Sequence, residues 1–354
     1  MIKSCTITFH GAINYGAFLQ AYALQCFLGT SNVILNYNPK KKTDWHSFVS
    51  KKKRGQLPVF WRLLALWRRL QYKRCYFKEY DMLRLSQEFH SCKSVFKNLP
   101  QADFYIVGSD QIWNSELLST YSYPWEIYFL TFENENIKRI AYSASLGGNE
   151  WTADFTTKVL PHLKKMDAIS VRENSSVPFL TSIGLKNIMV TCDPTILHTA
   201  DFYRSRFPYS KDGCQNHTLL FSLAMEIPVN IQEILNGKKI LSHKFTKQEP
   251  LVAKWLHCID TADAVITDSF HCTIFSILFH KNFVVFPHAM KNRSERLTML
   301  LGKVNLGYRF LAGEETKEQI EEIMCRPVDW LQIDKILEDW RIESGNWLNN
   351  ALIL

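Results

Sequence analysis

Ten short, mostly apolar runs that alternate with helical or loop segments constrain the fold of this chain most strongly. Six lie before residue 195 and four after it, at positions 5–10, 33–37, 104–107, 139–143, 168–171, 188–191, 218–223, 239–241, 264–267 and 283–286. Strands that alternate with helices are typical of parallel sheets covered by their crossover helices. We therefore expect an α/β protein with two Rossmann-like domains, each built on a parallel sheet.

The length of the chain requires more than one domain, because 354 residues exceed what one hydrophobic core usually supports. We expect an N-terminal α/β domain over 1–195, with a basic helical insertion at about 40–97, and a C-terminal α/β domain with terminal helices over 196–354. Apolar content of 46% and charged content of 21% are those of an ordinary globular protein. No uncharged apolar run is long enough for a transmembrane helix.

The start of the chain and its cysteines indicate a cytoplasmic protein. The first apolar stretch is short and interrupted, unlike that of a signal peptide. Nine cysteines lie at scattered positions without a CxxC pair. An odd, unpatterned set favours reduced thiols and argues against a disulfide framework or a structural zinc site.

Positive charge is concentrated in one region. Residues 40–97 carry 16 Lys/Arg and 4 Asp/Glu, although the whole chain has a net charge of only +8. Within this region, residues 59–77 have the pattern of a helix rich in Trp and Leu with a basic face. Such a helix can rest peripherally on the anionic inner face of a membrane, or it can pack on its own domain with a solvated basic face. No nucleic-acid-binding motif accompanies it, so we expect no nucleic-acid partner.

The segment 264–280 contains the most distinctive candidate for chemistry. An apolar strand at 264–267 is followed by a polar turn, Asp268 and Ser269, and by a helix that we expect to begin at His271. Either turn residue can cap that helix, whose first free amides favour a phosphate or carboxylate. An imidazole beside such an anion site, at the carboxyl edge of a parallel strand, indicates a catalytic group. The other interpretation is a buried histidine with a satisfied hydrogen bond.

Four motifs resemble those of the polysaccharide pyruvyl transferase family, in the same order. They are the strand–turn–helix at 14–21, the glycine-containing turn at 103–114, the pair at 170–173 and 193–195, and the strand–His–helix signature at 264–280. The resemblance implies a GT-B-like fold, with a ligand cleft between the two domains at the carboxyl ends of the strands.

The resemblance also implies an activity. The family moves an enolpyruvyl unit from phosphoenolpyruvate to a sugar of a capsule or other cell-surface glycan precursor, and closes a cyclic pyruvate ketal. Two sugar hydroxyls add in turn to C2 of the donor, C3 is protonated to a methyl group, and phosphate leaves. The implied partners are phosphoenolpyruvate, as co-substrate, and a glycan or lipid-linked oligosaccharide acceptor. No metal or redox cofactor is required.

The same resemblance assigns donor-side residues. His271 is the implied acid/base group, and Arg172 is implied to hold the donor's carboxylate or phosphate. The alternative for Arg172 is an interdomain ion pair with Asp or Glu. Ser269 and Phe270 are expected to contribute through the backbone at the helix start. Many family members have Arg-Leu-His where this chain has Ser-Phe-His, so one anion contact is missing.

A substitute for that arginine is expected just downstream. Arg293 and Arg296 lie at a strand-to-helix turn, from which they can reach the donor phosphate, and Ser294 can cap the helix at 297–301. The alternative for this turn is a solvated surface loop.

The acceptor is expected at two turns of the first domain. The candidate acceptor-binding residues are Asn14, Tyr15, Gly16, Gly108, Ser109, Asp110 and Gln111. We expect the amides of the first turn to face the cleft, and the side chains of the second turn to bind sugar hydroxyls. Trp113 or Trp125 either stacks on a pyranose or belongs to the core. Asp193 is interpreted as a residue that fixes the hinge region, with an acid role as the alternative.

Two other functions remain open. A GT-B-type glycosyltransferase that uses a nucleotide sugar would need a carboxylate for the ribose, and no clear Glu stands in that place. A non-catalytic scaffold of glycan assembly would account for the missing arginine, but the presence of His271 and Arg172 favours an enzyme.

Overall fold

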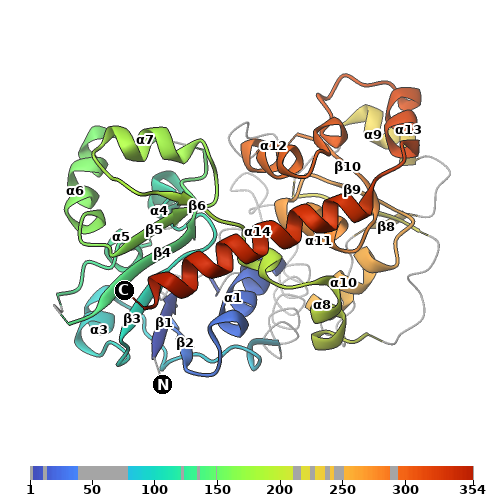
Figure 1. Ribbon diagram of the computed structural model, residues 1–354. Helices are drawn as coiled ribbons and strands as arrows, with labels where there is room; N and C mark the ends of the chain where they lie inside the picture. The colour runs from blue at the N-terminus through green and yellow to red at the C-terminus, as the bar shows by residue number, and fades with distance from the viewer. Residues whose placement is uncertain are drawn as a thin grey trace, which may run out of the picture.

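Two parallel sheets form the framework of the protein (Figure 1). The computed structural model describes residues 3–10, 14–38, 79–120, 123–133, 136–148, 150–209, 217–223, 228–235, 240–242, 251–287 and 294–353. The basic helix expected at 59–77 lies outside these residues.

The first sheet has six strands in the order β2-β1-β3-β4-β5-β6. They are β1 (Ser4–Ile7), β2 (Asn32–Ile34), β3 (Phe104–Val107), β4 (Lys138–Ala144), β5 (Ala168–Val171) and β6 (Met189–Val190). Strand β1 pairs on both sides, with Ser4 opposite Asn32 of β2 and Phe104 of β3. The strand order reverses at β1, and such a reversal is where parallel sheets bind ligands beyond the carboxyl ends.

Helices cover both faces of the first sheet, because its strands carry apolar side chains on both sides. Tyr105 and Val107 face one apolar cluster, whereas Phe104 and Ile106 face the other. The connecting helices are α1 (Tyr15–Leu28), α3 (Cys92–Lys97), α4 (Ser115–Thr120), α5 (Trp125–Tyr128), α6 (Ala153–Leu163), α7 (Ser176–Ser182) and the 3-10 helix η2 (Pro194–Leu197).

The second sheet repeats this topology with four strands, in the order β10-β9-β7-β8. They are β7 (Thr218–Phe221), β8 (Ile240–Ser242), β9 (Ala264–Thr267) and β10 (Asn282–Val285). Its helices are α8 (Ala200–Arg206), α9 (Val229–Leu235), α10 (Leu251–Asp260), α11 (Phe270–Leu278), α12 (Ser294–Lys303), α13 (Lys317–Cys325) and the 3-10 helix η4 (Gly307–Arg309). Apolar residues of α10 and α11 pack on one face, and those of α9 and α13 on the other.

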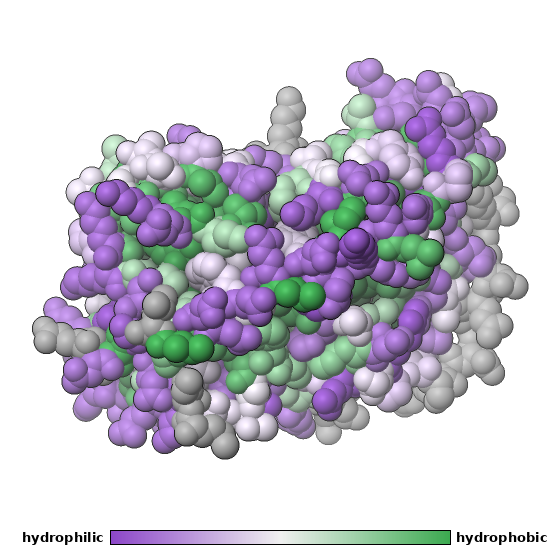
Figure 2. Space-filling model, viewed as in Figure 1, coloured by the Kyte–Doolittle hydropathy of each residue, from purple (hydrophilic) through white to green (hydrophobic). Residues whose placement is uncertain are grey.

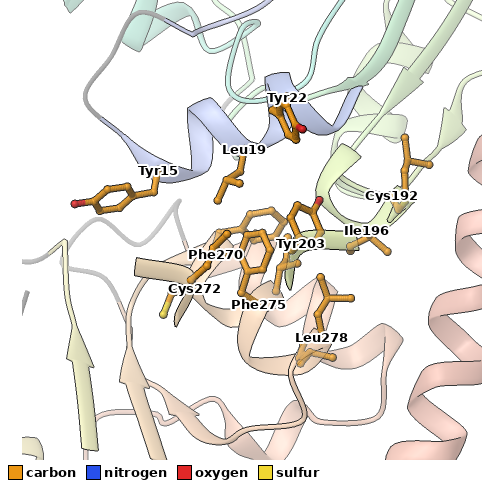
Figure 3. Close-up of a cluster of buried hydrophobic side chains, with 14 of the residues drawn as sticks. Tyr15, Leu19, Tyr22, Cys192, Ile196, Tyr203, Phe270, Cys272, Phe275 and Leu278 are labelled. Atoms are coloured by element: carbon orange, nitrogen blue, oxygen red, sulfur yellow. The ribbon is translucent and has the colours of Figure 1, made fainter. Parts of the chain in front are cut away.

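One apolar cluster joins the two sheets through α1. Figure 3 shows Tyr15 and Leu19 of α1 on the side of the cluster opposite Phe270 and Phe275 of α11. The Tyr15 ring also stacks on Trp255 of α10, with centroids 5.2 Å apart. The first turn of α1 is therefore held against the first turn of α11.

The last helix, α14 (Trp330–Ala351), runs across both sheets (Figure 1). Its Ser344 hydroxyl accepts a hydrogen bond from the Cys192 amide at 2.9 Å, and Arg341 Nε donates to the Ile196 carbonyl at 2.8 Å. Its outer face is mostly hydrophilic (Figure 2), although Ile342 on this helix is 51% exposed. Among the described helices, none is long and apolar enough to cross a membrane.

The expected order of strands is confirmed, including the three predicted at 104–107, 168–171 and 264–267. The expected terminal helices are also found, as α13 and α14, with Pro327 between them. Helix α11 begins at Phe270 rather than His271, because Ser269 caps it. The domain division at residue 195 stays a prediction, and α14 has contacts on both sides of it, from Trp347 to Tyr142 of β4 and from Trp340 to Lys303 of α12.

Glu79 connects the first half of the chain to α10. Its carboxylate accepts hydrogen bonds from the Val252 amide at 2.8 and 3.0 Å and from the Ala253 amide at 3.2 Å. Burial raises the pKa of Glu79 to about 7, although these hydrogen bonds act in the opposite direction. A group that titrates near neutral pH therefore sits where the start of α10 is fixed.

We expect Glu79 to make stability fall as pH rises. Between pH 4.5 and 7 the unfolded chain releases this proton before the folded protein does, so the free energy of unfolding should drop by on the order of 3 kcal/mol. Glu79→Gln keeps a carbonyl acceptor but cannot titrate, so its stability should be flatter over this window. Urea unfolding between pH 4.5 and 7 measures the free energy of unfolding of the wild type and of Glu79→Gln. Glu88→Gln, at an exposed glutamate, is the control. Parallel curves for wild type and Glu79→Gln would contradict the assignment.

Candidate active site

Polar side chains from both sheets converge beyond the carboxyl ends of the strands. Ser109 and Asp110 follow β3, Arg172 follows β5, Asp193 follows β6, and His271 lies in the first turn of α11, after β9. Since parallel strands all end at the same edge, their following residues meet there although they are far apart in sequence.

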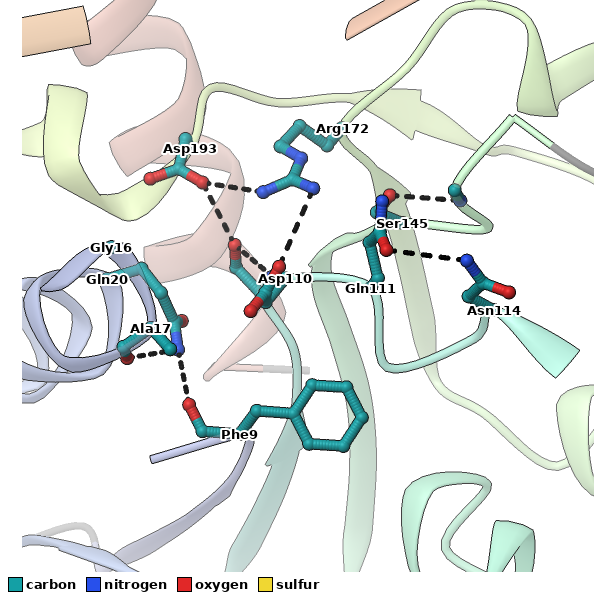
Figure 4. A network of polar contacts seen from close by, with 12 residues as sticks. Phe9, Gly16, Ala17, Gln20, Asp110, Gln111, Asn114, Ser145, Arg172 and Asp193 are labelled. Carbon is teal, nitrogen blue, oxygen red and sulfur yellow. Dashed lines mark hydrogen bonds and ion pairs between the residues drawn. The ribbon is translucent and has the colours of Figure 1, made fainter. Parts of the chain in front are cut away.

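Arg172 lies at the centre of this cluster, with none of its surface exposed. Its Nη1 is 3.0 Å from Asp193 Oδ2, and its Nη2 is 3.9 Å from Glu173 Oε1 and 4.0 Å from Asp110 Oδ1. Figure 4 shows the guanidinium between Asp193 and Asp110. Nε and Nη2 make no hydrogen bond to any described residue. An ion pair and a free donor edge thus coexist in one side chain. The pair is formed with Asp193, in the connection after β6, and so lies within residues 1–195 rather than between the two predicted domains.

Asp193 receives more contacts than any other carboxylate of the cluster. Its Oδ2 accepts from Arg172 and, at 3.2 Å, from the Ser109 hydroxyl, while its Oδ1 accepts from the amide and hydroxyl of Thr195 at 3.0 and 2.7 Å. Burial would raise the pKa of Asp193, but His271 and Arg172 outweigh it and hold the pKa well below its usual range. Asp193 is therefore an ionised carboxylate that binds several residues of the site, in addition to any part it has in the hinge region.

His271 is held between α1 and Asp193. Its Nε2 lies 3.7 Å from Asp193 Oδ2, an ion-pair distance beyond hydrogen-bonding range, and makes no hydrogen bond to the described residues. On its other side the ring contacts Gly16, where a Cβ atom would lie 2.0 Å from Nδ1. The absence of a side chain at Gly16 is what admits the imidazole.

The three residues before His271 have structural contacts of their own. The Ser269 hydroxyl caps α11 by accepting from the Cys272 amide at 3.4 Å, whereas Asp268 binds the Leu223 amide at 2.7 Å. The Phe270 ring contacts Arg172, whose Cζ is 4.7 Å from the ring centroid. Phe270 thus contributes its ring to the site, which the expectation of a purely backbone role did not include.

Arg296 lies against the same ring, with its Cζ 5.3 Å from the Phe270 centroid. This position brings a second cation to the ring that Arg172 contacts, and the role of Arg296 as a substitute for the missing arginine stays a prediction. Ser294 is the first residue of α12, and its hydroxyl has no hydrogen-bond partner among the described residues, so the expected cap is not observed. Arg293 lies outside the described residues.

Glu173 completes the cluster and was not singled out in the sequence. It is 1% exposed, its Oε1 accepts a hydrogen bond from the Ser145 hydroxyl, and its Oε2 has no described partner. Burial raises the pKa of Glu173, although Arg172 and Arg296 act in the opposite direction. The signal was present in the sequence, since Glu173 directly follows Arg172.

The expected acceptor turn after β3 reaches the cluster in part. Ser109 binds Asp193, and Asp110 faces Arg172. Gln111 is 5% exposed and accepts from Asn114 at 3.4 Å. Gly108 has a φ of +125°, and a Cβ atom there would lie 2.1 Å from the Tyr142 carbonyl oxygen, so glycine is required.

The first turn of α1 differs from expectation. The Asn14 side chain caps α1 by accepting from the Gly16 and Ala17 amides at 2.9 and 3.3 Å, so these amides are occupied within the helix start. The Tyr15 ring is buried in the apolar cluster. Trp113, one of the possible stacking platforms, is fully buried and belongs to the core.

No group of three or more His, Cys, Asp or Glu side chains within the described ranges is placed to hold a metal ion. What the cluster offers chemically is two arginines, an ionised carboxylate beside an imidazole, and a second carboxyl that burial favours in its neutral form. Such a set can bind an anion and move protons.

The chain is similar to solved structures of low sequence identity. UGT89C1 of Arabidopsis thaliana, crystallised with UDP-L-rhamnose, is 10% identical over 99% of both chains, with a TM-score of 0.50. UGT71G1 of Medicago truncatula with UDP-glucose is 11% identical over 99% and 98% of the chains, with a TM-score of 0.48. A putative UDP-N-acetylglucosamine 2-epimerase of Listeria monocytogenes is 12% identical over 96% and 90%, with a TM-score of 0.48.

Two parallel sheets with the site between their carboxyl edges, together with the first of these structures, define a GT-B-like α/β protein. The sequence model of the polysaccharide pyruvyl transferase family matches residues 14–289, and the chain belongs to that family. No curated protein matches the chain significantly.

Proposed function

We propose that this transferase moves an enolpyruvyl unit from phosphoenolpyruvate to a sugar of a cell-surface glycan precursor and closes a cyclic pyruvate ketal. The observation that carries the proposal is the buried guanidinium of Arg172, with Nε and Nη2 free of hydrogen bonds to described residues. These two donors lie on one edge of a planar group, which suits a carboxylate. Phosphoenolpyruvate has both a carboxylate and a phosphate to place.

The donor phosphate lies, in this proposal, near Arg296 and the N-terminus of α11. Arg296 is supported by its contact with Phe270, the same ring that Arg172 contacts. The helix end adds a partial positive charge. Arg293 keeps its proposed phosphate contact as a prediction outside the described residues.

His271 takes the proton of the first attacking hydroxyl through Nε2, which is buried and has no hydrogen-bond partner among the described residues. The Asp193 carboxylate at 3.7 Å stabilises the imidazolium that results. The acceptor sugar lies on the side of Asp110 and Gln111, at the turn after β3. The glycan is carried on a lipid in this proposal, and membrane contact through residues 59–77 stays a prediction.

Phosphate release from phosphoenolpyruvate, with a panel of galactose-, mannose- and glucose-containing acceptors, tests the function. We expect acceptor-dependent release in the wild type and a loss of about 10²- to 10⁴-fold in His271→Ala, as for removal of an acid/base group. His280→Ala, at the opposite end of α11 and paired with Asp334, is the matched control and should keep wild-type activity.

Three results would change the conclusion. Release that survives in His271→Ala would keep the function but overturn the assignment of the base. No release with any acceptor, together with thermal stabilisation by a UDP-sugar, would indicate a glycosyltransferase. Stabilisation by neither ligand would favour a scaffold of glycan assembly.

A further inference from the structure

The proposed function leaves one buried ionisable group of the site without a role, the Glu173 carboxyl. It is 1% exposed and lies beside the Nη2 edge of Arg172, whereas Asp193 and His271 lie on the Nη1 side. Ser145 holds its Oε1, and its Oε2 has no described partner. A donor bound at the free edge of Arg172 therefore lies beside the Glu173 carboxyl, with Asp193 and His271 on the Nη1 side of the same guanidinium.

The charges around Arg172 favour a neutral Glu173. Three carboxyl groups, those of Asp110, Glu173 and Asp193, lie within 4.0 Å of this one guanidinium. Asp193 is held in its ionised form by four hydrogen bonds, and Asp110 is partly exposed. Glu173 accepts one hydrogen bond, from the Ser145 hydroxyl, and the nearest cation is Arg172 Nη2 at 3.9 Å; Arg296 favours its ionised form and Glu295 opposes it. It is therefore the carboxyl of the three whose buried charge has the fewest direct partners. Its pKa is raised by burial, in agreement with this geometry.

We propose that Glu173 is the catalytic acid that protonates C3 of the enolpyruvyl unit, an inference that rests on the proposed function. The Oε2–H bond breaks, a C3–H bond forms, and C2 becomes electron-poor. The first sugar hydroxyl, deprotonated by His271, then bonds to C2.

The remaining steps close the proton balance. The C2–O bond to phosphate breaks, phosphate leaves with the electron pair, and His271 gives it the proton taken from the first hydroxyl. The second hydroxyl bonds to C2, and its proton returns to the Glu173 carboxylate. The proton of the first hydroxyl thus ends on phosphate. The proton of the second hydroxyl replaces the one that Glu173 delivered to C3.

Glu173→Gln tests this role, because the amide resembles the neutral acid in size and charge but is a very weak acid. With phosphoenolpyruvate and an active acceptor, we expect release of phosphate to fall at least about 100-fold. The thermal shift caused by phosphoenolpyruvate alone should remain, since no charge is removed from the binding site. Glu295→Gln, which removes a carboxylate near Glu173 that takes no part in the reaction, is the control.

Glu173→Asp keeps an acid and separates catalysis from structure. We expect Glu173→Asp to keep part of the activity. Its rate should fall at high pH, as that of the wild type does, because the acid has to be protonated. The residual rate of Glu173→Gln should not fall at high pH. Wild-type activity in Glu173→Gln would overturn the role of Glu173 alone. So would a Glu173→Asp variant without the high-pH loss. An inactive wild type, with every acceptor, would overturn the proposed function itself.

Discussion

A Gly16→Ala variant is expected to fold normally and to lose at least about 100-fold in turnover, because misplacing a catalytic group by about 1 Å can cost that much. The added Cβ atom would lie 2.0 Å from Nδ1 and 2.4 Å from Cγ of His271. These are atoms of a rigid ring whose opposite side faces Asp193, so the imidazole has to leave its position. The measurement is phosphate release beside the thermal unfolding midpoint.

The fold is expected to survive this change, because alanine is a better helix former than glycine by about 1 kcal/mol. Gly302→Ala, in α12, is the matched control, since its Cβ atom would meet nothing within 4 Å. It should gain similar helix stability and keep its activity. An active Gly16→Ala enzyme would mean that His271 works from another position, and the proposed base would then have to be reconsidered.

The second large effect is expected for Asp193→Asn. The amide leaves Arg172 buried without its best counter-ion, which should cost about 3–5 kcal/mol of unfolding free energy at neutral pH. Turnover should fall about 10²- to 10⁴-fold, because the imidazolium of His271 loses its carboxylate. Urea unfolding and phosphate release measure the two effects.

The difference in stability should depend on pH in a defined direction. Because the pKa of Asp193 is held below its ordinary value of 3.8, its stabilisation is present above that pH and is lost as pH falls further. Wild type and Asp193→Asn should therefore converge in acid. Ser109→Ala, which removes one hydrogen bond to the same carboxylate, should cost only about 1 kcal/mol. Equal stabilities at neutral pH would show that Arg172 does not depend on Asp193.

The sequence predicted the strands well, because each apolar run is bounded by polar or turn-forming residues. It also placed Arg172 and His271 at the ends of strands, where the structure finds them. The sequence did not predict which strands are neighbours in the sheet. The sequence predicted a strand before Arg172 and another before Asp193, but not that β5 and β6 are neighbours in the sheet, which brings Asp193 to Arg172.

The contact of Gly16 with His271 could not be predicted from the sequence for a different reason. It forms only when α1 docks on α11, through an apolar cluster that includes Tyr15 and Phe270. Periodicity shows that such side chains are buried, but it does not show which helix lies opposite. The same holds for Glu173 and Ser145, whose hydrogen bond depends on the pairing of β4 with β5.

The path of α14 has a mechanical consequence for the site. Ser344 accepts a hydrogen bond from the Cys192 amide and Arg341 donates one to the Ile196 carbonyl, and these two partners lie on either side of Asp193 in the sequence. The C-terminal helix therefore fixes both ends of the short loop that carries the Asp193 carboxylate. If the angle between the two sheets changed so that α14 shifted, this loop would shift with it. The position of Asp193 is therefore coupled to the angle between the two sheets.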